Sequence, residues 1–251
     1  ALRNYLRRRL KTGDEDAIDR WIRMVATNRL TGHSKGFFSV YTLPPNQATP
    51  AENQIRINRK LNQLPEYRDT HAIILQKSRL LQSRLTPDQQ RNLHAMSANA
   101  NCLTAPAHRT GMIADTSIQL TVTSPPFLDV VQYAKDNWLR CWFNAIDADA
   151  VAANITMSST IADWRDQMSA VFRELHRITR RGGWVAFEVG EVRGGAVLLE
   201  RQVWAAAEGL PFDRLFVLVN QQEFTKTSNC WGVANNSKGT NSNRIVLLRR
   251  R

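Results

Sequence analysis

Beyond residue 116 the sequence alternates β-branched runs with amphipathic helical stretches, and this order constrains the fold more than any other feature. One helix face is marked by apolar residues at helical spacing: Trp164, Met168, Val171, Phe172, Leu175 and Ile178. Gly182-Gly183 is expected to end that helix, and strands are expected at 117–123, 184–189, 212–220 and 244–248. A further helix is expected at 196–209. The pattern predicts an α/β fold with a mostly parallel sheet, whose last two strands form an antiparallel edge because no helix separates them.

The first hundred residues have a helical pattern instead. Thr12-Gly13-Asp14-Glu15 and Thr86-Pro87-Asp88-Gln89 both fit a capping box, in which side chains bond the free N–H groups of a helix start. Further helices are expected over Pro50–Leu64 and Asp69–Leu85, and a short extended piece over Phe37–Leu43. We therefore divide the chain into a helical segment at 1–102 and an α/β segment at 103–251.

The charge is concentrated in the first half of the chain. The net charge is +12; residues 1–122 hold 18 basic and 9 acidic residues, and residues 123–251 hold 16 and 13. Arg outnumbers Lys 27 to 7, and the Arg guanidinium matches phosphate geometry. The helical segment is therefore a candidate for DNA contact, and the alternative is a set of solvated charged faces.

Cysteine and histidine usage argues against a metal site or a disulfide framework. The 3 cysteines are widely spaced without a C-x-x-C pair, and the 5 histidines show no ligand spacing. The longest apolar runs have 5 residues, far below the roughly 20 that a bilayer span needs. We expect no metal, no membrane partner and a reducing cytoplasm as the compartment.

The segment Thr123-Ser124-Pro125-Pro126-Phe127 carries the clearest chemistry. It follows an expected strand, and ligands of open α/β sheets bind at the carboxyl ends of the strands. Two prolines fix the backbone and remove two N–H donors, which leaves carbonyl acceptors in a rigid frame. With a hydroxyl before them and an aromatic ring after them, they suit a planar group that carries an –NH2.

This segment resembles the catalytic motif of S-adenosylmethionine-dependent DNA amino-methyltransferases, which methylate cytosine N4 or adenine N6. The resemblance extends over Ile113–Phe127, over 177–185 and over 243–246, and covers the chain from about Leu103 onward. It implies a Rossmann-like methyltransferase sheet, S-adenosyl-L-methionine as cofactor, and double-stranded DNA as partner. A companion restriction endonuclease is left open.

The resemblance also implies the roles of the motif residues. Ser124 and the Pro125 carbonyl would accept hydrogen bonds from the target amine, Pro126 would complete the rigid turn, and Phe127 would stack on the flipped base. Ser in the first position favours cytosine N4 over adenine N6.

Two departures concern the cofactor. We find no Gly-rich cofactor loop after a first strand, so no cofactor-binding residue is assigned, and Ala105-Pro106 stands where related chains usually have Gly-Asp. The stretch Glu188–Gly195 is better explained as a strand-to-loop transition than as that loop. Since the chain also begins at Ala1 inside a helical pattern, we expect a fragment that is inactive alone.

The long polar loop Gln221–Asn243 adds candidate DNA contacts. Trp231 could stack on a base or anchor the loop, and Lys226, Lys238 and Arg244 could contact phosphates. Three other readings stay open: a non-catalytic DNA-binding remnant, one subunit of a split methyltransferase, and an enzyme that methylates RNA or a protein glutamine.

Overall fold

The fold is given by a computed structural model that describes residues 1–32, 34–39, 50–62, 64, 66–126, 133–192, 196–221 and 242–251. The chain divides into two compact units, and each is described by itself. The first unit contains Ala1–Asn101 and Gln132–Asn154, and the second contains Cys102–Val131 and Ile155–Arg251. The segment 132–154, which the sequence analysis places in the α/β part, clusters with the helical unit.

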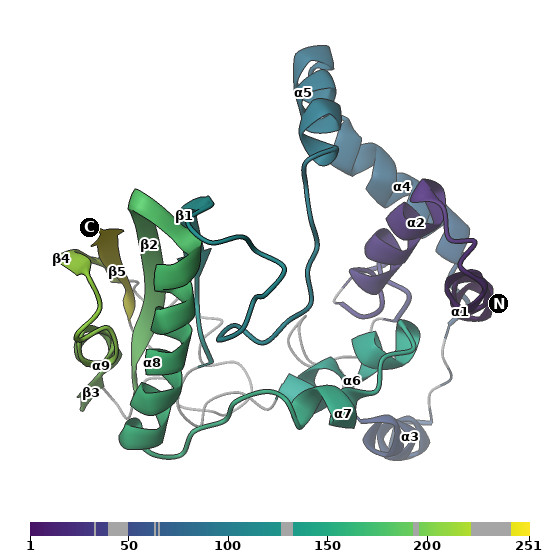
Figure 1. The fold of residues 1–251 in the computed structure, drawn as a ribbon. Helices are drawn as coiled ribbons and strands as arrows, with labels where there is room; N and C mark the ends of the chain where they lie inside the picture. The colour runs from purple at the N-terminus through teal and green to yellow at the C-terminus, as the bar shows by residue number, and fades with distance from the viewer. Residues whose placement is uncertain are drawn as a thin grey trace. The chain divides into compact units, whose positions relative to one another are not determined.

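The first unit is helical among the residues described. Its helices are α1 (Leu2–Thr12), α2 (Ala17–Thr27), α3 (Ala51–Lys60), α4 (Thr70–Gln82), α5 (Pro87–Ser97), α6 (Tyr133–Phe143) and α7 (Ala148–Ala152) (Figure 1). Its core is formed by buried residues of α1, α2, α4 and α6 and by Leu30, which follows α2: Leu6, Val25, Ala26, Leu30, Ile74 and Phe143. The helices expected at 50–64 and 69–85 are therefore confirmed, each shorter than the pattern suggested.

One of the two predicted capping boxes is wrong. Thr12 is the last residue of α1, and Gly13, with φ of 75°, ends that helix in the left-handed conformation that glycine adopts without strain. The box of α2 lies at Asp16, whose carboxylate accepts the Asp19 N–H at 2.8 Å. The box at Thr86 is confirmed, with the Thr86 hydroxyl accepting the Gln89 N–H.

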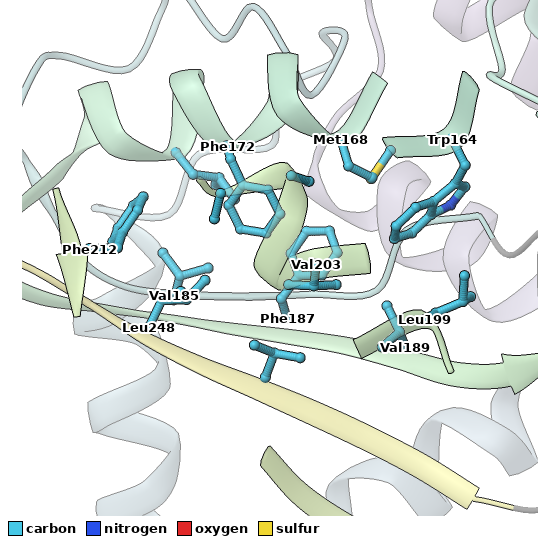
Figure 2. Close-up of a cluster of buried hydrophobic side chains, with 14 of the residues drawn as sticks. Trp164, Met168, Phe172, Val185, Phe187, Val189, Leu199, Val203, Phe212 and Leu248 are labelled. Carbon is cyan, nitrogen blue, oxygen red and sulfur yellow. The ribbon is translucent and has the colours of Figure 1, made fainter. Parts of the chain in front are cut away.

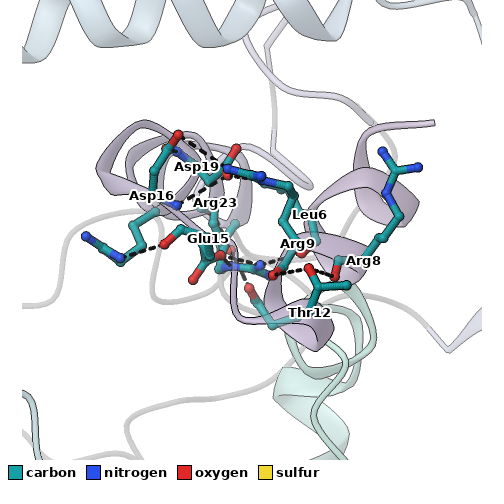
Figure 3. Close-up of polar contacts among 11 residues, drawn as sticks. Leu6, Arg8, Arg9, Thr12, Glu15, Asp16, Asp19 and Arg23 are labelled. Atoms are coloured by element: carbon teal, nitrogen blue, oxygen red, sulfur yellow. Dashed lines mark hydrogen bonds and ion pairs between the residues drawn. The ribbon is translucent and has the colours of Figure 1, made fainter.

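Several arginines of this unit are held in ion pairs (Figure 3). The Arg9 Nε atom donates to the Asp19 Oδ2 atom at 2.7 Å, and this bond lowers the pKa of the buried Asp19 carboxyl. Arg23 pairs with Glu15 and also donates to the Leu6 carbonyl at 2.9 Å. Part of the basic excess therefore holds α1 against α2. Arg7 and Arg8 are exposed on α1. The DNA contact expected of this helical segment stays a prediction.

The second unit is an α/β sheet. Its elements are β1 (Ile118–Thr123), α8 (Ile161–Ile178), β2 (Thr179–Val192), β3 (Val197–Leu198), α9 (Leu199–Ala206), β4 (Phe212–Gln221) and β5 (Ser242–Arg250) (Figure 1). The sheet order is β1-β2-β5-β4, and β3 pairs with β2 outside this path. β1 and β2 are parallel, whereas β5 runs antiparallel to both of its neighbours. β1, β2 and β4 thus share one direction, and the antiparallel final pair is confirmed.

The core of this unit lies between the sheet and helices α8 and α9 (Figure 2). Alternate residues of β2, namely Val185, Phe187 and Val189, are buried against the apolar face of α8. The rings of Phe172 and Phe187 have their centroids 4.8 Å apart. Burying each such side chain stabilises the fold by about 1.5–3 kcal/mol. The helix face that the apolar spacing predicts is therefore confirmed.

The start of β2 differs from the expectation. Gly182-Gly183 does not end α8, which stops at Ile178; the glycines lie inside β2, where the register with β1 shifts. Gly182 has φ of 72°. A Cβ atom on Gly183 would lie 2.8 Å from the Arg180 carbonyl oxygen, so the irregular strand start requires glycine. The helix expected at 196–209 is also shorter, because Val197 pairs with Val192 in β3.

Candidate active site

The Ser-Pro-Pro motif leaves the carboxyl end of β1. Thr123 is the last residue of the strand and lies opposite Phe187 in the parallel ladder with β2. Ser124 is exposed, and Pro125 and Pro126 are half-buried. The expected position of the motif at the carboxyl end of a parallel strand pair is therefore observed.

The chain that leads into β1 is bonded to the last turns of α8. Glu174 accepts two hydrogen bonds of 2.6 Å from Thr110, one from its backbone N–H and one from its hydroxyl. Arg177 donates to Glu174 and to the Ile113 carbonyl at 2.9 Å, and it pairs with Asp115. These bonds, from Arg177 first, lower the pKa of Glu174 to about 2. The approach to the motif is thus held by a charged cluster.

The motif itself is bonded to the first turn of α8. The Trp164 indole Nε1–H donates to the Pro126 carbonyl oxygen at 3.0 Å. Trp164 is only 2% exposed and belongs to the sheet core. From the sequence we expected Trp164 only to pack. The packing is confirmed, but the hydrogen bond was missed, because an apolar helix face shows burial without showing where the indole N–H points.

The two prolines offer acceptors without backbone donors. Pro125 and Pro126 have no N–H, so each contributes only its carbonyl oxygen, and the Ser124 hydroxyl oxygen is a further acceptor beside them. The Pro126 carbonyl already accepts a hydrogen bond from Trp164. The hydroxyl of Ser124 and the carbonyl of Pro125 are acceptors on neighbouring residues, a pair that would match the two N–H groups of an exocyclic amine.

The other predicted site residues are not brought to this motif by the described part of the chain. Phe127, Lys226, Trp231 and Lys238 lie outside the described residues, so their roles stay predictions. Arg244 is on β5, where its Nη1 atom lies 2.8 Å from Oε1 of Glu200, a glutamate on α9 with a side chain 9% exposed. A phosphate contact by Arg244 would compete with this ion pair.

Among the described residues, we assign none to a cofactor site or to a metal site. Glu188–Val192 forms the end of β2, which agrees with a strand-to-loop transition and not with a loop after a first strand. No group of three or more His, Cys, Asp or Glu side chains could hold a metal ion within the described ranges. Within them, likewise, no helix is long and apolar enough to cross a membrane.

Comparison with known proteins gives a partial structural similarity. No protein-family model matches the chain, and no curated protein does so. Among solved structures, the chain is similar to three structures of one protein, TTHA0409, a proposed DNA modification methylase from Thermus thermophilus. The selenomethionine form aligns at 20% identity with a TM-score of 0.31 over 55% of this chain and 47% of that chain. A second structure aligns at 21% identity with a TM-score of 0.36, over 59% of this chain and 52% of that chain. The complex with S-adenosyl-L-methionine aligns at 19% identity with a TM-score of 0.33, over 59% of this chain and 54% of that chain. The present chain thus spans about half the length of that protein.

Proposed function

We propose that this chain carries the amine-binding part of the active site of an S-adenosylmethionine-dependent DNA methyltransferase. The observation that carries the proposal is the exposed Ser124-Pro125-Pro126 turn at the carboxyl end of β1, with the Pro126 carbonyl held by Trp164. The turn presents two acceptors at the sheet edge where ligands bind. The resemblance of 113–127 to the motif of the amino-methyltransferases supports the same assignment.

The chemistry follows from the lone pair of the target amine. An exocyclic amine of a base is a poor nucleophile because its nitrogen lone pair is conjugated with the ring. When its two N–H groups donate to the Ser124 hydroxyl and the Pro125 carbonyl, the nitrogen becomes more pyramidal and the lone pair is freed. Fixed dipoles of this kind lower the barrier without reorganising during the reaction.

The methyl donor and the base complete the proposal. When bound, S-adenosylmethionine would supply an electrophilic methyl group: the N–CH3 bond would form as the S–CH3 bond breaks, the thioether S-adenosylhomocysteine would leave, and the amine would lose one proton to solvent. The described residues do not present a glycine-rich cradle for it, so we assign only the acceptor side of the reaction to this chain. Phe127 stacks on the target base, which has left the duplex at a cost of a few kcal/mol. We propose cytosine N4 as the acceptor ahead of adenine N6 because Ser124 stands first in the motif.

Double-stranded DNA is proposed as the substrate. The net charge of +12 and the predominance of Arg over Lys support a polyanionic partner. Lys226, Trp231, Lys238 and Arg244 are the proposed contacts, with the helical segment 1–102 as a further candidate.

The test is a methyl-transfer assay on the full-length product of the gene. The protein is incubated with S-adenosylmethionine carrying a tritiated methyl group and with duplex DNA, and the hydrolysed nucleosides are separated. We expect labelled N4-methylcytosine. Ser124→Ala should lower kcat about 100-fold and change the dissociation constant for DNA less than about two-fold. Ser169→Ala, on the surface of α8, is the matched control.

Another target base, another substrate and a non-catalytic protein would each give a different result in the same experiment. Labelled N6-methyladenine would change the target base, and labelled RNA or labelled glutamine would change the substrate. DNA binding without any binding of labelled S-adenosylmethionine would show a non-catalytic protein. An equal loss of transfer and DNA affinity in Ser124→Ala would contradict the role given to the hydroxyl.

A further inference from the structure

Trp164 combines complete burial with a directed polar contact. It lies in the first turn of α8, where its backbone N–H bonds to the Thr160 carbonyl at 3.1 Å. Its ring belongs to the cluster with Met168, Phe172 and Leu199, and Figure 2 shows it at one end of that row. Because the ring is 2% exposed and packed on several sides, it cannot turn without disturbing the core. The direction of its N–H is therefore fixed by packing.

The acceptor of this N–H is the carbonyl oxygen of Pro126, which belongs to a motif whose two prolines have no backbone N–H to donate. Pro125 and Pro126 lack N–H groups, so no backbone hydrogen bond can start from either residue. The proline ring fixes φ of Pro126 near −65°, but it leaves ψ free to choose between an extended and a helical value. The bond from Trp164 to the Pro126 carbonyl at 3.0 Å fixes that remaining angle.

Fixing ψ of Pro126 determines how its two flanking peptide units are oriented to each other. The peptide unit before Pro126 contains the Pro125 carbonyl, one of the two acceptors for the amine under the proposed function. The peptide unit after Pro126 contains the nitrogen of residue 127, so its orientation sets the direction of the chain after the motif. A single hydrogen bond thus acts on both sides of Pro126.

We propose that Trp164 is a positioning residue for methyl transfer, which aims the Pro125 carbonyl by holding the carbonyl of Pro126. This rests on the proposed function of the Ser124-Pro125-Pro126 turn. Trp164 does not contact the reacting atoms in this assignment. Trp164 therefore affects the geometry of the transition state, in which a small misplacement of an acceptor lowers the rate. It affects the binding of DNA only weakly.

The test is Trp164→Phe in the full-length gene product, which removes the N–H and keeps an aromatic ring. We expect kcat to fall about ten-fold or more, with KM for DNA and the dissociation constant for S-adenosylmethionine within about two-fold. Trp204→Phe is the matched control, since Trp204 lies on α9 and packs against the same core. It should lose packing area and retain kcat.

A second replacement separates packing from hydrogen bonding if Trp164→Phe unfolds. A benzothiophene side chain introduced at position 164 has the shape of indole and lacks the N–H. It should fold, and kcat should fall as for phenylalanine. A kcat equal to that of the unmodified protein would overturn the positioning role.

A spectroscopic measurement distinguishes this proposal from the proposed function. The indole Nε1–H of Trp164 should give an NMR signal that exchanges slowly with water and disappears in Trp164→Phe. A fast-exchanging signal would overturn the inference even if the protein methylates DNA. A slow signal in a protein that transfers no methyl group to any base would instead refute the proposed function, and the positioning role of Trp164 would be refuted with it.

Discussion

Neutralising Glu174 should loosen the chain that leads into β1. The Glu174 carboxylate accepts two hydrogen bonds from Thr110 at 2.6 Å and two from Arg177, and its side chain is 10% exposed. Glu174→Gln keeps the shape and removes the charge. The change therefore tests the charge-assisted part of these bonds, which is stronger than a neutral hydrogen bond.

The magnitude follows from the pKa of this carboxyl. Its pKa is lowered from 4.5 to about 2, and each unit corresponds to about 1.4 kcal/mol, which gives an upper limit of about 3 kcal/mol. Arg177 is 30% exposed, so solvent screening reduces the contribution. We expect Glu174→Gln to lower the free energy of unfolding by about 1–2 kcal/mol near pH 7.

The pH dependence gives the sharper test. A carboxyl whose pKa is lower in the folded state stabilises the protein above its unfolded pKa of about 4.5, and this stability is lost as the pH falls toward 2. The difference between wild type and Glu174→Gln should therefore shrink steadily below about pH 4.5.

The assay is urea unfolding at about pH 7, 5 and 3, followed by circular dichroism, with amide exchange at Thr110 as a local probe. Glu208→Gln, which changes an exposed carboxylate beyond α9, is the control and should have no effect above about 0.5 kcal/mol. A difference between wild type and Glu174→Gln that stays constant from pH 7 to pH 3 would refute the reasoning.

Two further substitutions test the sheet. Gly183→Ala places a Cβ atom 2.8 Å from a backbone carbonyl and should lower the free energy of unfolding by about 1–3 kcal/mol. Gly111→Ala, with nothing within 4 Å of the added atom, should have little effect in the same urea titration. Arg244→Gln should destabilise by about 2–4 kcal/mol because it leaves the buried Glu200 carboxylate unpaired, and Glu200→Gln in the same chain should recover part of that loss in a double-mutant cycle. Unchanged stability with weakened DNA binding would instead assign Arg244 to the DNA.

The sequence predicts those parts of the fold that depend on local periodicity. The apolar spacing along 164–178 predicts the buried face of α8, and β-branched residues predict β1. The prolines that follow β1 predict where the strand ends. In each case the local pattern and the tertiary packing favour the same conformation, so the prediction is confirmed.

Other features depend on competition between neighbouring signals. Thr12-Gly13-Asp14-Glu15 fits a helix start, but Gly13 also fits a helix end, and the observed box lies at Asp16.

Features that depend on the path of the chain cannot be predicted from periodicity. The position of β5 between β2 and β4 is one of them. The affiliation of α6 with the helical unit likewise depends on contacts of its Phe143 with residues distant in sequence.

The hydrogen bonds around the motif show why the candidate site was predicted only in part. Glu174 and Trp164 lie toward opposite ends of α8. Glu174 bonds to Thr110, in the segment before β1, and Trp164 bonds to Pro126, in the segment after it. Ten residues of helix between them span about 15 Å, so one rigid element holds both the approach to the strand and the turn that follows it. The sequence shows the apolar face of this helix, but not the polar partners at its two ends. Trp164 is bonded to the motif itself, whereas Glu174 is bonded to the chain before β1. Loosening Glu174 should therefore affect the proposed methyl transfer less than removing the indole N–H of Trp164.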